Sequence, residues 1–207
     1  PLSTLLAAGF EGLGVKVSPM ADCEKLGGFG ELEFLSSGGE LKEIVLWTGG
    51  LRTVERRVVH LESGTVLSGT GKIRPPLAPI GAFILDPDPA LVRSGLLGML
   101  AESAGFAAID PTIAYLTAGQ APASPWVTAY AVLLVAAPKA ARVKALLAQN
   151  GLEAVRAHRR GFAVEADQYL QSVRGKAGRP VDLFLTRAAG LPVVVIAERV
   201  TCPPRGP

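Results

Sequence analysis

Histidine and cysteine, the side chains that most often act in catalysis or bind zinc, are scarce in this sequence. There are two histidines, His60 and His158, and two cysteines, Cys23 and Cys202, which lie far apart along the chain. Their spacing does not suit a zinc site, and no Gly-x-Ser-x-Gly or phosphate-loop motif is present. We therefore expect no metal, ordinary reduced thiols, and a surface or half-buried imidazole at His60.

Three aspartates, Asp86, Asp88 and Asp110, could form a carboxylate cluster, but each directly precedes a proline. Proline fixes its own φ and disfavours helix in the residue before it, so all three pairs favour turn or capping roles. In particular, Asp88 is predicted to be a helix N-cap with Pro89 at the first helical position.

The strongest indication of function is a segment rich in basic residues. Residues 139–179 contain 9 Lys and Arg residues against 3 Asp and Glu residues. Guanidinium groups suit phosphate oxygens, and nearby glycines let the backbone approach a polyanion. Because aromatic residues are not interleaved, contact with the backbone or helix ends of such a partner is favoured over base stacking. The alternative is a solvated edge that prevents sheet aggregation. The candidate residues for binding a polyanion are Arg156, His158, Arg159, Arg160, Arg174, Lys176 and Arg179.

Composition narrows the class of protein. The 207 residues are 49% hydrophobic, which suffices for a substantial core in one large or two small domains. No apolar run is long enough to span a membrane, and Leu2–Phe10 lacks the basic start of a signal peptide. We therefore expect a cytoplasmic protein. Residues 1–85 carry 8 basic and 9 acidic side chains and the rest carry 13 and 9, so the second half favours an anionic partner.

Hydrophobic periodicity and breakers predict the elements. The first part is expected to contain a helix at 2–10, a strand at 13–17, a Gly-rich connection at 20–30, and two hairpins, 31–35 with 41–48 and 54–61 with 65–67. Residues 31–35 alternate like a strand with one wet face. Residues 72–79 hold three prolines and predict a linker.

Beyond the linker the pattern predicts an α+β layer with its helices on one face. Strands are expected at 80–85, 106–109, 113–117, 127–136, 152–160, 181–187 and 191–200, and helices at 90–104, 138–149 and 165–173. Gly105 and Gly151 are predicted to end the first two helices. Residues 201–207 form a tail.

One group of motif residues resembles a known family. The pattern Asp-Pro-Asp-Pro-Ala-x-x-Arg-x-Gly-Leu, then Ile-Asp-Pro-x-Ile-Ala-Tyr-Leu-Thr, then Ala-Ser-Pro-Trp, resembles the THUMP-like domain that ends a family of bacterial class I S-adenosylmethionine-dependent methyltransferases. The matching residues are Asp86, Pro87, Asp88, Pro89, Arg93, Gly95, Asp110, Pro111, Tyr115, Leu116, Thr117, Ser124 and Pro125.

The resemblance implies an α/β part followed by an α+β part. Residues 1–71 would be the C-terminal portion of a Rossmann-like methyltransferase sheet, 72–79 the linker and 80–200 the THUMP-like domain. Residues 13–17, 31–35 and 41–48 would be the fifth, sixth and seventh strands of that sheet.

The resemblance further implies S-adenosylmethionine as the family cofactor and structured RNA, typically tRNA, as the partner. The Gly-rich turn after a first strand is missing here, and Gly27–Gly30 lacks an apolar strand before it. This chain alone is therefore expected neither to bind the cofactor nor to be active. The open edge of the fifth strand is expected to meet the missing N-terminal catalytic half, a second copy or the Pro-rich linker. The alternative is a non-enzymatic accessory or scaffold protein with an apolar interface.

Overall fold

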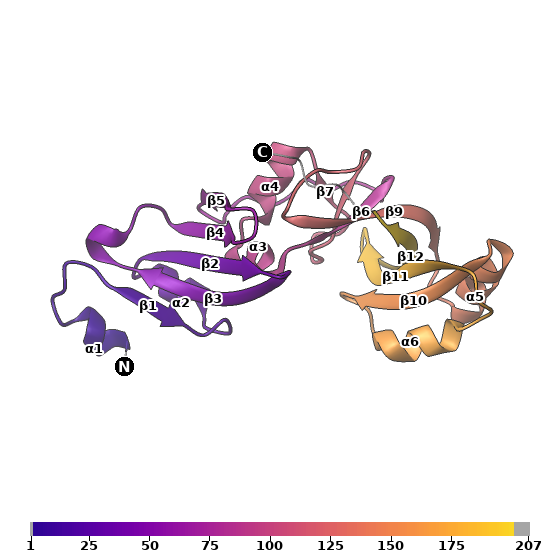
Figure 1. Ribbon diagram of the computed structural model, residues 1–207, viewed down its shortest axis with the longest axis horizontal. Helices are drawn as coiled ribbons and strands as arrows, with labels where there is room; N and C mark the ends of the chain where they lie inside the picture. The colour runs from indigo at the N-terminus through magenta and orange to yellow at the C-terminus, as the bar shows by residue number, and fades with distance from the viewer. Residues whose placement is uncertain (1, 201–207) are drawn as a thin grey trace. The chain divides into compact units, whose positions relative to one another are not determined.

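The computed structural model of the protein describes residues 2–200 (Figure 1). These residues form two compact units, each of which makes most of its contacts within itself. Unit 1 consists of residues 2–75 and 87–104, and unit 2 consists of residues 76–86 and 105–200. The chain therefore passes between the units three times. The predicted tail at 201–207 lies outside the described residues.

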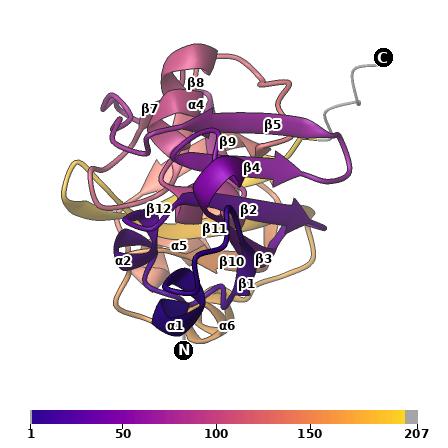
Figure 2. The same ribbon diagram turned by 90° about the vertical axis from the view of Figure 1, so that its left-hand side faces the viewer.

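Unit 1 contains a mixed five-stranded sheet with the order β1-β3-β2-β4-β5, seen from one side in Figure 2. Its strands are β1 Gly14–Val17, β2 Glu31–Ser37, β3 Glu40–Trp47, β4 Arg56–His60 and β5 Thr65–Gly69. β3 lies antiparallel between β1 and β2, whereas β2 and β4 run parallel. Both predicted hairpins are confirmed, and Gly38 and Gly39 turn the first one with φ of 62° and 73°. The buried side chains of this sheet include Leu32, Phe34, Ile44, Leu46 and Val58.

The short helices of unit 1 are α1 Leu2–Leu6, α2 Cys23–Gly27 and the 3-10 turn η1 Gly49–Leu51. Helix α2 lies within the predicted Gly-rich connection at 20–30, where no helix was expected. Asp22 caps this helix, because its side chain accepts hydrogen bonds from the backbone N–H groups of Glu24 and Lys25. The cap was not predicted because the glycines that follow Leu26 indicate a loop rather than a helix.

Glu31, expected on the wet face of its strand, is buried with 1% of its surface exposed. Its carboxylate lies 2.9 Å from the Arg57 guanidinium and accepts hydrogen bonds from the Thr53 N–H and hydroxyl and from the Val54 N–H. Burial alone would raise the pKa of Glu31, but these hydrogen bonds and Arg57 outweigh it and lower the pKa. A charged residue can thus occupy the polar position of an alternating strand pattern and still be buried.

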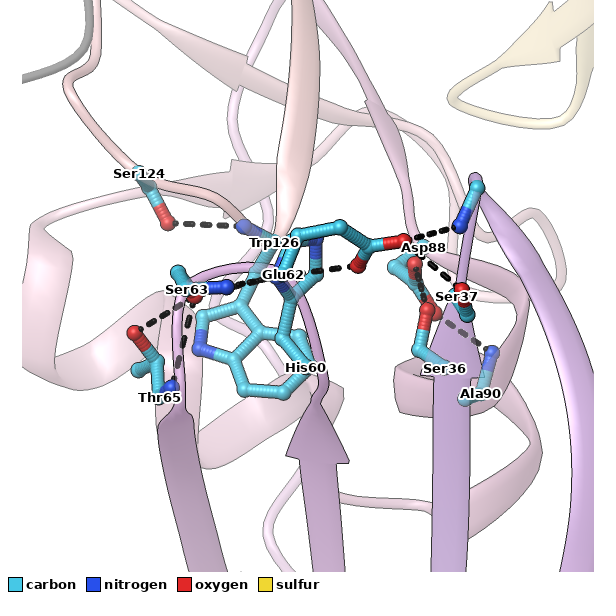
Figure 3. Close-up of polar contacts among 11 residues, drawn as sticks. Ser36, Ser37, His60, Glu62, Ser63, Thr65, Asp88, Ala90, Ser124 and Trp126 are labelled. Atoms are coloured by element: carbon cyan, nitrogen blue, oxygen red, sulfur yellow. Dashed lines mark hydrogen bonds and ion pairs between the residues drawn. The ribbon is translucent and has the colours of Figure 1, made fainter.

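The helix predicted at 90–104 is two helices, α3 Pro89–Ser94 and α4 Leu97–Ala104. Gly95 ends α3 with a φ of 76°, a left-handed conformation that glycine adopts without strain. The prediction of Asp88 as N-cap is confirmed: one carboxylate oxygen accepts from Ala90 N–H at 2.7 Å, and the other accepts from the Ser36 hydroxyl of β2 at 2.5 Å (Figure 3).

The same contacts explain why residues 87–104 cluster with unit 1, whereas the predicted boundary at 72–79 gives them to the following domain. The buried face of α3 and α4 includes Leu91, Leu96 and Leu100, and α3 lies against β2, β3 and β4. Arg93 donates hydrogen bonds to the carbonyls of Pro19 and Ala21, which lie before α2. Apolar burial and these polar contacts bring the two helices back to the first sheet.

Unit 2 contains a seven-stranded mixed sheet with the order β10-β11-β12-β9-β6-β8-β7. Its strands are β6 Phe83–Pro87, β7 Ala107–Ala108, β8 Leu116–Ala118, β9 Val127–Ala136, β10 Leu152–Arg159, β11 Arg179–Ala188 and β12 Leu191–Arg199. β9 has the predicted bounds, and the predicted hairpin of β11 with β12 is confirmed. Its helices are α5 Ala140–Gln149 and α6 Ala166–Val173.

The two faces of this sheet bury different sets of side chains. Helices α5 and α6 cover one face, where Val143, Leu147 and Val173 pack against β11 and β12. The other face holds an aromatic group in which Phe184 makes edge-to-face contacts with Tyr115 and Tyr130 at 5.2 and 4.8 Å between ring centroids. Helices on one side were predicted, whereas the aromatic group was not.

Candidate nucleic-acid interface

The predicted basic residues come from β10 and the residue that follows it, from the loop at 174–178 and from the start of β11. Strands β10 and β11 are parallel, and α6 makes the crossover between them. Leu152 pairs with Arg179 at one end of this strand pair, and Arg159 pairs with Leu185 at the other end. At roughly 3.3 Å per residue the two ends lie about 23 Å apart. The basic residues near the two ends of this strand pair therefore form two separate groups.

We call the first group the end cluster; it lies where β10 finishes and consists of His158, Arg160, Asp86 and Asp182. His158 Nε2 lies 3.1 Å from a carboxylate oxygen of Asp182. The imidazole also stacks on Phe184, with 4.6 Å between centroids and 11° between planes. His158 is thus occupied by contacts within unit 2.

Arg160 is held in the end cluster by three contacts. Its guanidinium lies 2.8 Å from the Asp86 carboxylate, donates to the Ala114 carbonyl at 3.1 Å, and lies 4.5 Å from the Tyr115 ring centroid. Burial raises the pKa of Asp86, although the charges of Arg160 and His158 oppose this shift. Asp86 is therefore an ion-pair partner rather than the turn or capping residue that was predicted.

The other predicted turn aspartate is confirmed. Asp110 accepts hydrogen bonds from the N–H and hydroxyl of Thr112 and from the Gly190 N–H. Burial alone would raise its pKa, but these hydrogen bonds outweigh burial and lower it. Two aspartates of unit 2 that both precede a proline thus have pKa shifts of opposite direction.

We call the second group the start cluster; it lies where β10 and β11 begin and consists of Lys144, Arg174, Lys176 and Arg179. All four side chains belong to exposed residues. Within residues 2–200, Lys144, Arg174 and Lys176 have no ion-pair partner, and Arg179 lies 3.7 Å from Glu198. Lys144, which the sequence places on the outward face of its helix, was missing from the predicted site.

Two predicted residues lie outside both clusters. Arg156 is exposed in the middle of β10 and, across the described part of the chain, makes no ion pair. Arg159 is also exposed, but its guanidinium lies 3.1 Å from Glu165 and donates to the Phe162 carbonyl. Arg156 is therefore available to an anionic ligand without breaking an existing contact, and Arg159 is not.

A cavity of about 480 Å³ lies at the start cluster. Its walls come from α5, the turn into β10, the last residue of α6 and the loop that follows α6. The lining residues include Lys144, Gly151, Glu153, Val173, Gly175, Lys176 and Ala177. A second cavity of about 560 Å³ in unit 2 is almost entirely apolar, with Leu77, Ile80, Ile109, Val135 and Val193 in its walls.

The described residues offer little for catalysis. His60 has a side chain 16% exposed, and its Nδ1 lies 2.9 Å from the Ser63 hydroxyl in the β4–β5 turn. In the same turn Glu62 accepts from Ser37 and Gly38 (Figure 3). Burial raises the pKa of the Cys23 thiol, which disfavours the reactive thiolate. Cys202 lies outside the described residues. Between residues 2 and 200 no group of His, Cys, Asp and Glu could hold a metal ion.

The glycines at 27–30 do not fit a nucleotide-type cofactor. Gly27 is the last residue of helix α2, Gly28 and Gly30 follow that helix rather than an apolar strand, and β2 begins directly after them. A Cβ at Gly30 would collide with the Trp47 carbonyl, so the space beside this glycine is filled by the protein's own backbone.

The helices between residues 2 and 200 do not fit a membrane span either. None of them combines the length and the hydropathy that a membrane-spanning helix requires.

Comparison with known proteins confirms the resemblance. Residues 127–199 match the family described as THUMP domain-like. Two Mycobacterium tuberculosis proteins, from strains CDC 1551 and H37Rv, are named as uncharacterized S-adenosylmethionine-dependent methyltransferases. Each is 33% identical over 178 residues, covering 84% of this chain and 49% of the relative. The chain thus spans about half the length of these relatives.

A crystal structure of a putative methyltransferase from Porphyromonas gingivalis W83 has a similar fold. Its TM-score is 0.73 and its sequence identity 18%, over 97% of this chain and 54% of the other. The mixed α/β fold with two mixed sheets is therefore shared with a methyltransferase structure. The chain is similar over most of its length to S-adenosylmethionine-dependent methyltransferases and carries a THUMP domain-like region.

Proposed function

We propose that this chain is the C-terminal part of an S-adenosylmethionine-dependent RNA methyltransferase and that unit 2 docks structured RNA, with tRNA as the first candidate. The observation that carries this proposal is the start cluster, which lies within the THUMP domain-like region and in which Lys144, Arg174 and Lys176 have no ion-pair partner among residues 2–200. An arginine or lysine without an ion pair can bind a phosphate without first losing a contact.

The sheet of unit 1 supports the methyltransferase part of the proposal. β3 lies antiparallel between β1 and β2, and the resemblance assigns these strands as the seventh, fifth and sixth of a class I sheet. Among the described strands, β1 pairs on one side only, with β3. Its free edge would receive the N-terminal catalytic half or a second copy. The cofactor would then bind in that half, outside this chain.

The chemistry assigned to this chain is positioning. An RNA methyltransferase must hold one nucleotide against the methyl donor, and a docking unit that fixes the rest of the RNA raises the effective concentration of that nucleotide. The proposed role of unit 2 is to bind the phosphate backbone and so set the register of the RNA.

The test is fluorescence anisotropy of a labelled tRNA pool at low and moderate salt. The variant changes Arg156, Arg174 and Lys176 to Gln together, because all three are exposed and form no ion pair with any residue from 2 to 200. Affinity should fall steeply with salt for the wild type, and the triple variant should bind about ten- to a hundredfold more weakly. A charge-matched control changes Arg52, Lys72 and Arg74 of unit 1 to Gln. Absence of wild-type binding at low salt would contradict RNA docking.

The apolar cavity of unit 2 favours a second candidate, a non-enzymatic accessory protein that acts through an apolar interface. The exposed side chains of Leu77 and Val135 extend its apolar surface. Self-association measured by analytical ultracentrifugation separates the two functions. Association that does not weaken as salt increases would favour the accessory protein, whereas a monomer with salt-sensitive RNA affinity would favour docking.

A further inference from the structure

The geometry points to a phosphate-binding site in the cavity of the start cluster, formed by Lys144, Lys176 and the backbone N–H groups of Gly175, Lys176 and Ala177. We assign its ligand as one phosphodiester group of the RNA. This inference rests on the proposed RNA docking. It adds the pocket that binds the RNA, the residue Lys144, which was outside the predicted set, and the phosphodiester as the group of the RNA that enters the pocket.

Unpaired hydrogen-bond donors are the first reason for an anion. Within the described chain, the N–H groups of Gly175, Lys176 and Ala177 have no acceptor, although the neighbouring Arg174 and Gly178 N–H groups do. Consecutive N–H groups in a loop commonly form a concave anion site. Lys144 and Lys176 also line this cavity, and neither has an ion-pair partner among residues 2–200.

The base of this loop is fixed by the protein, so the donors are held in place before a ligand arrives. Gly178 N–H donates to a carboxylate oxygen of Glu153 at 3.2 Å, and Arg179 N–H donates to the Gly151 carbonyl at 2.9 Å. A Cβ at Gly178 would lie 2.5 Å from the Gly151 oxygen, so the close approach of loop and turn requires glycine. Ordering of the loop therefore costs less on binding.

The remaining polar groups of the cavity do not favour a cation. Glu153 is the acidic residue of the wall, and its carboxylate already accepts from Gly178. At the end of α5, Asn150 and Gly151 donate to the carbonyls of Leu146 and Ala148. A volume of about 480 Å³ falls in the range of small-molecule sites and is large enough for one nucleotide.

The experiment is a ¹⁵N–¹H NMR titration of the 207-residue chain with a short RNA hairpin and, separately, with inorganic phosphate. Wild type is compared with the double variant Lys144→Gln/Lys176→Gln and with Lys139→Gln, an exposed lysine of the same unit outside the cavity. RNA should shift the amides of Gly175, Lys176 and Ala177. The double variant should bind RNA about five- to tenfold more weakly with a salt slope lower by about one, whereas Lys139→Gln should change affinity less than about twofold.

The outcomes separate this inference from the proposed function. RNA binding by the wild type without shifts at 175–177, or with equal affinity in the double variant, would overturn the pocket and leave RNA docking intact. Shifts with inorganic phosphate but not with RNA would assign the site to a free phosphate and overturn the RNA assignment. If RNA does not bind and neither ligand shifts the loop, both the pocket and RNA docking fail.

Discussion

The two ends of strand β10 carry similar basic residues in opposite physical situations. At the end cluster, His158 and Arg160 are half-buried and each lies beside an aspartate and an aromatic ring. At the start cluster, Arg174 and Lys176 are exposed and, in residues 2–200, unpaired. A phosphate could bind Arg160 only by replacing the Asp86 contact, so local charge alone does not indicate a binding residue.

The difference follows from the neighbours that topology supplies. The end of β10 lies beside β11 and opposite residues 84–86 and 109–115, which provide Asp182, Asp86 and the aromatic rings. The cavity at the start of β10 is lined by the C-terminal parts of α5 and α6 and by a glycine-containing loop, and Glu153 is the acidic residue of its wall. We therefore expect variants at one end to change stability and variants at the other to change RNA affinity.

The largest effect is expected for Phe184→Ala. Phe184 is fully buried and contacts His158, Tyr115 and Tyr130, so the variant would leave a cavity under the end cluster. The free energy of unfolding should fall by about 3–5 kcal/mol, measured by urea denaturation. Phe29→Ala is the control, since that ring is 55% exposed. A loss no greater than the control's would show that the aromatic group does not organise this end.

A pair of matched arginine variants tests the comparison directly. Arg160→Gln leaves Asp86 without its counter-ion and should lower the free energy of unfolding by about 2 kcal/mol, because the pair is only partly exposed. Arg174→Gln should leave stability within about 0.5 kcal/mol and weaken RNA binding roughly threefold. Denaturation and anisotropy are measured on both. If Arg160→Gln weakened RNA binding without changing stability, the two ends would be equivalent as ligand sites.

The pH dependence of stability should reveal the raised pKa of Asp86. Burial raises its pKa above the ordinary value of 3.8, so the folded protein binds this proton more tightly than the unfolded chain. Its contribution to stability is therefore full below 3.8 and is lost as the pH rises through the raised pKa. The unfolding free energy of wild type minus that of Asp86→Asn should therefore decrease as the pH rises above 3.8. Asp110→Asn should give the opposite trend, since the folded pKa of Asp110 is lowered.

The smallest effect is expected for Arg159→Gln. Its ion pair with Glu165 is exposed, with 38% and 69% of the two side chains accessible to solvent. Surface ion pairs contribute about 0–1 kcal/mol, so thermal unfolding should change little. RNA affinity should also change less than for Arg174→Gln, because Arg159 already has a partner. A larger loss of affinity than at Arg174 would extend the interface along β10.

Much of the local structure was predictable from sequence. The bounds of β9, the Asp88 cap and the hairpin of β11 with β12 follow from apolar runs and turn residues. Gly95 was harder, because a helical pattern continues through it and only its left-handed φ ends α3. Nor does a local pattern say which sheet a helix joins, which is why α3 and α4 were assigned to the second domain.

The candidate site was predicted only in part. Seven basic residues close in sequence suggested one surface, yet a strand, a helix and a second strand in succession favour a parallel pair, whose two connections lie at opposite ends. That rule could have separated Arg160 from Lys176. Lys144 could not be assigned to this site from the sequence, because it is 30 residues before Arg174. Helix α5 and the loop at 174–178 come together only in the folded unit.

The three passages of the chain between the units also constrain how the protein can fold during synthesis. The sheet of unit 1 is complete at Gly69, but the helices that cover it end at Ala104, after the chain has already supplied β6 to the other unit. At roughly 5–20 residues per second, the ribosome delivers those helices a few seconds after the sheet. During this interval the apolar side chains beneath α3 and α4 are uncovered, so the first unit is expected to mature only once the second has begun.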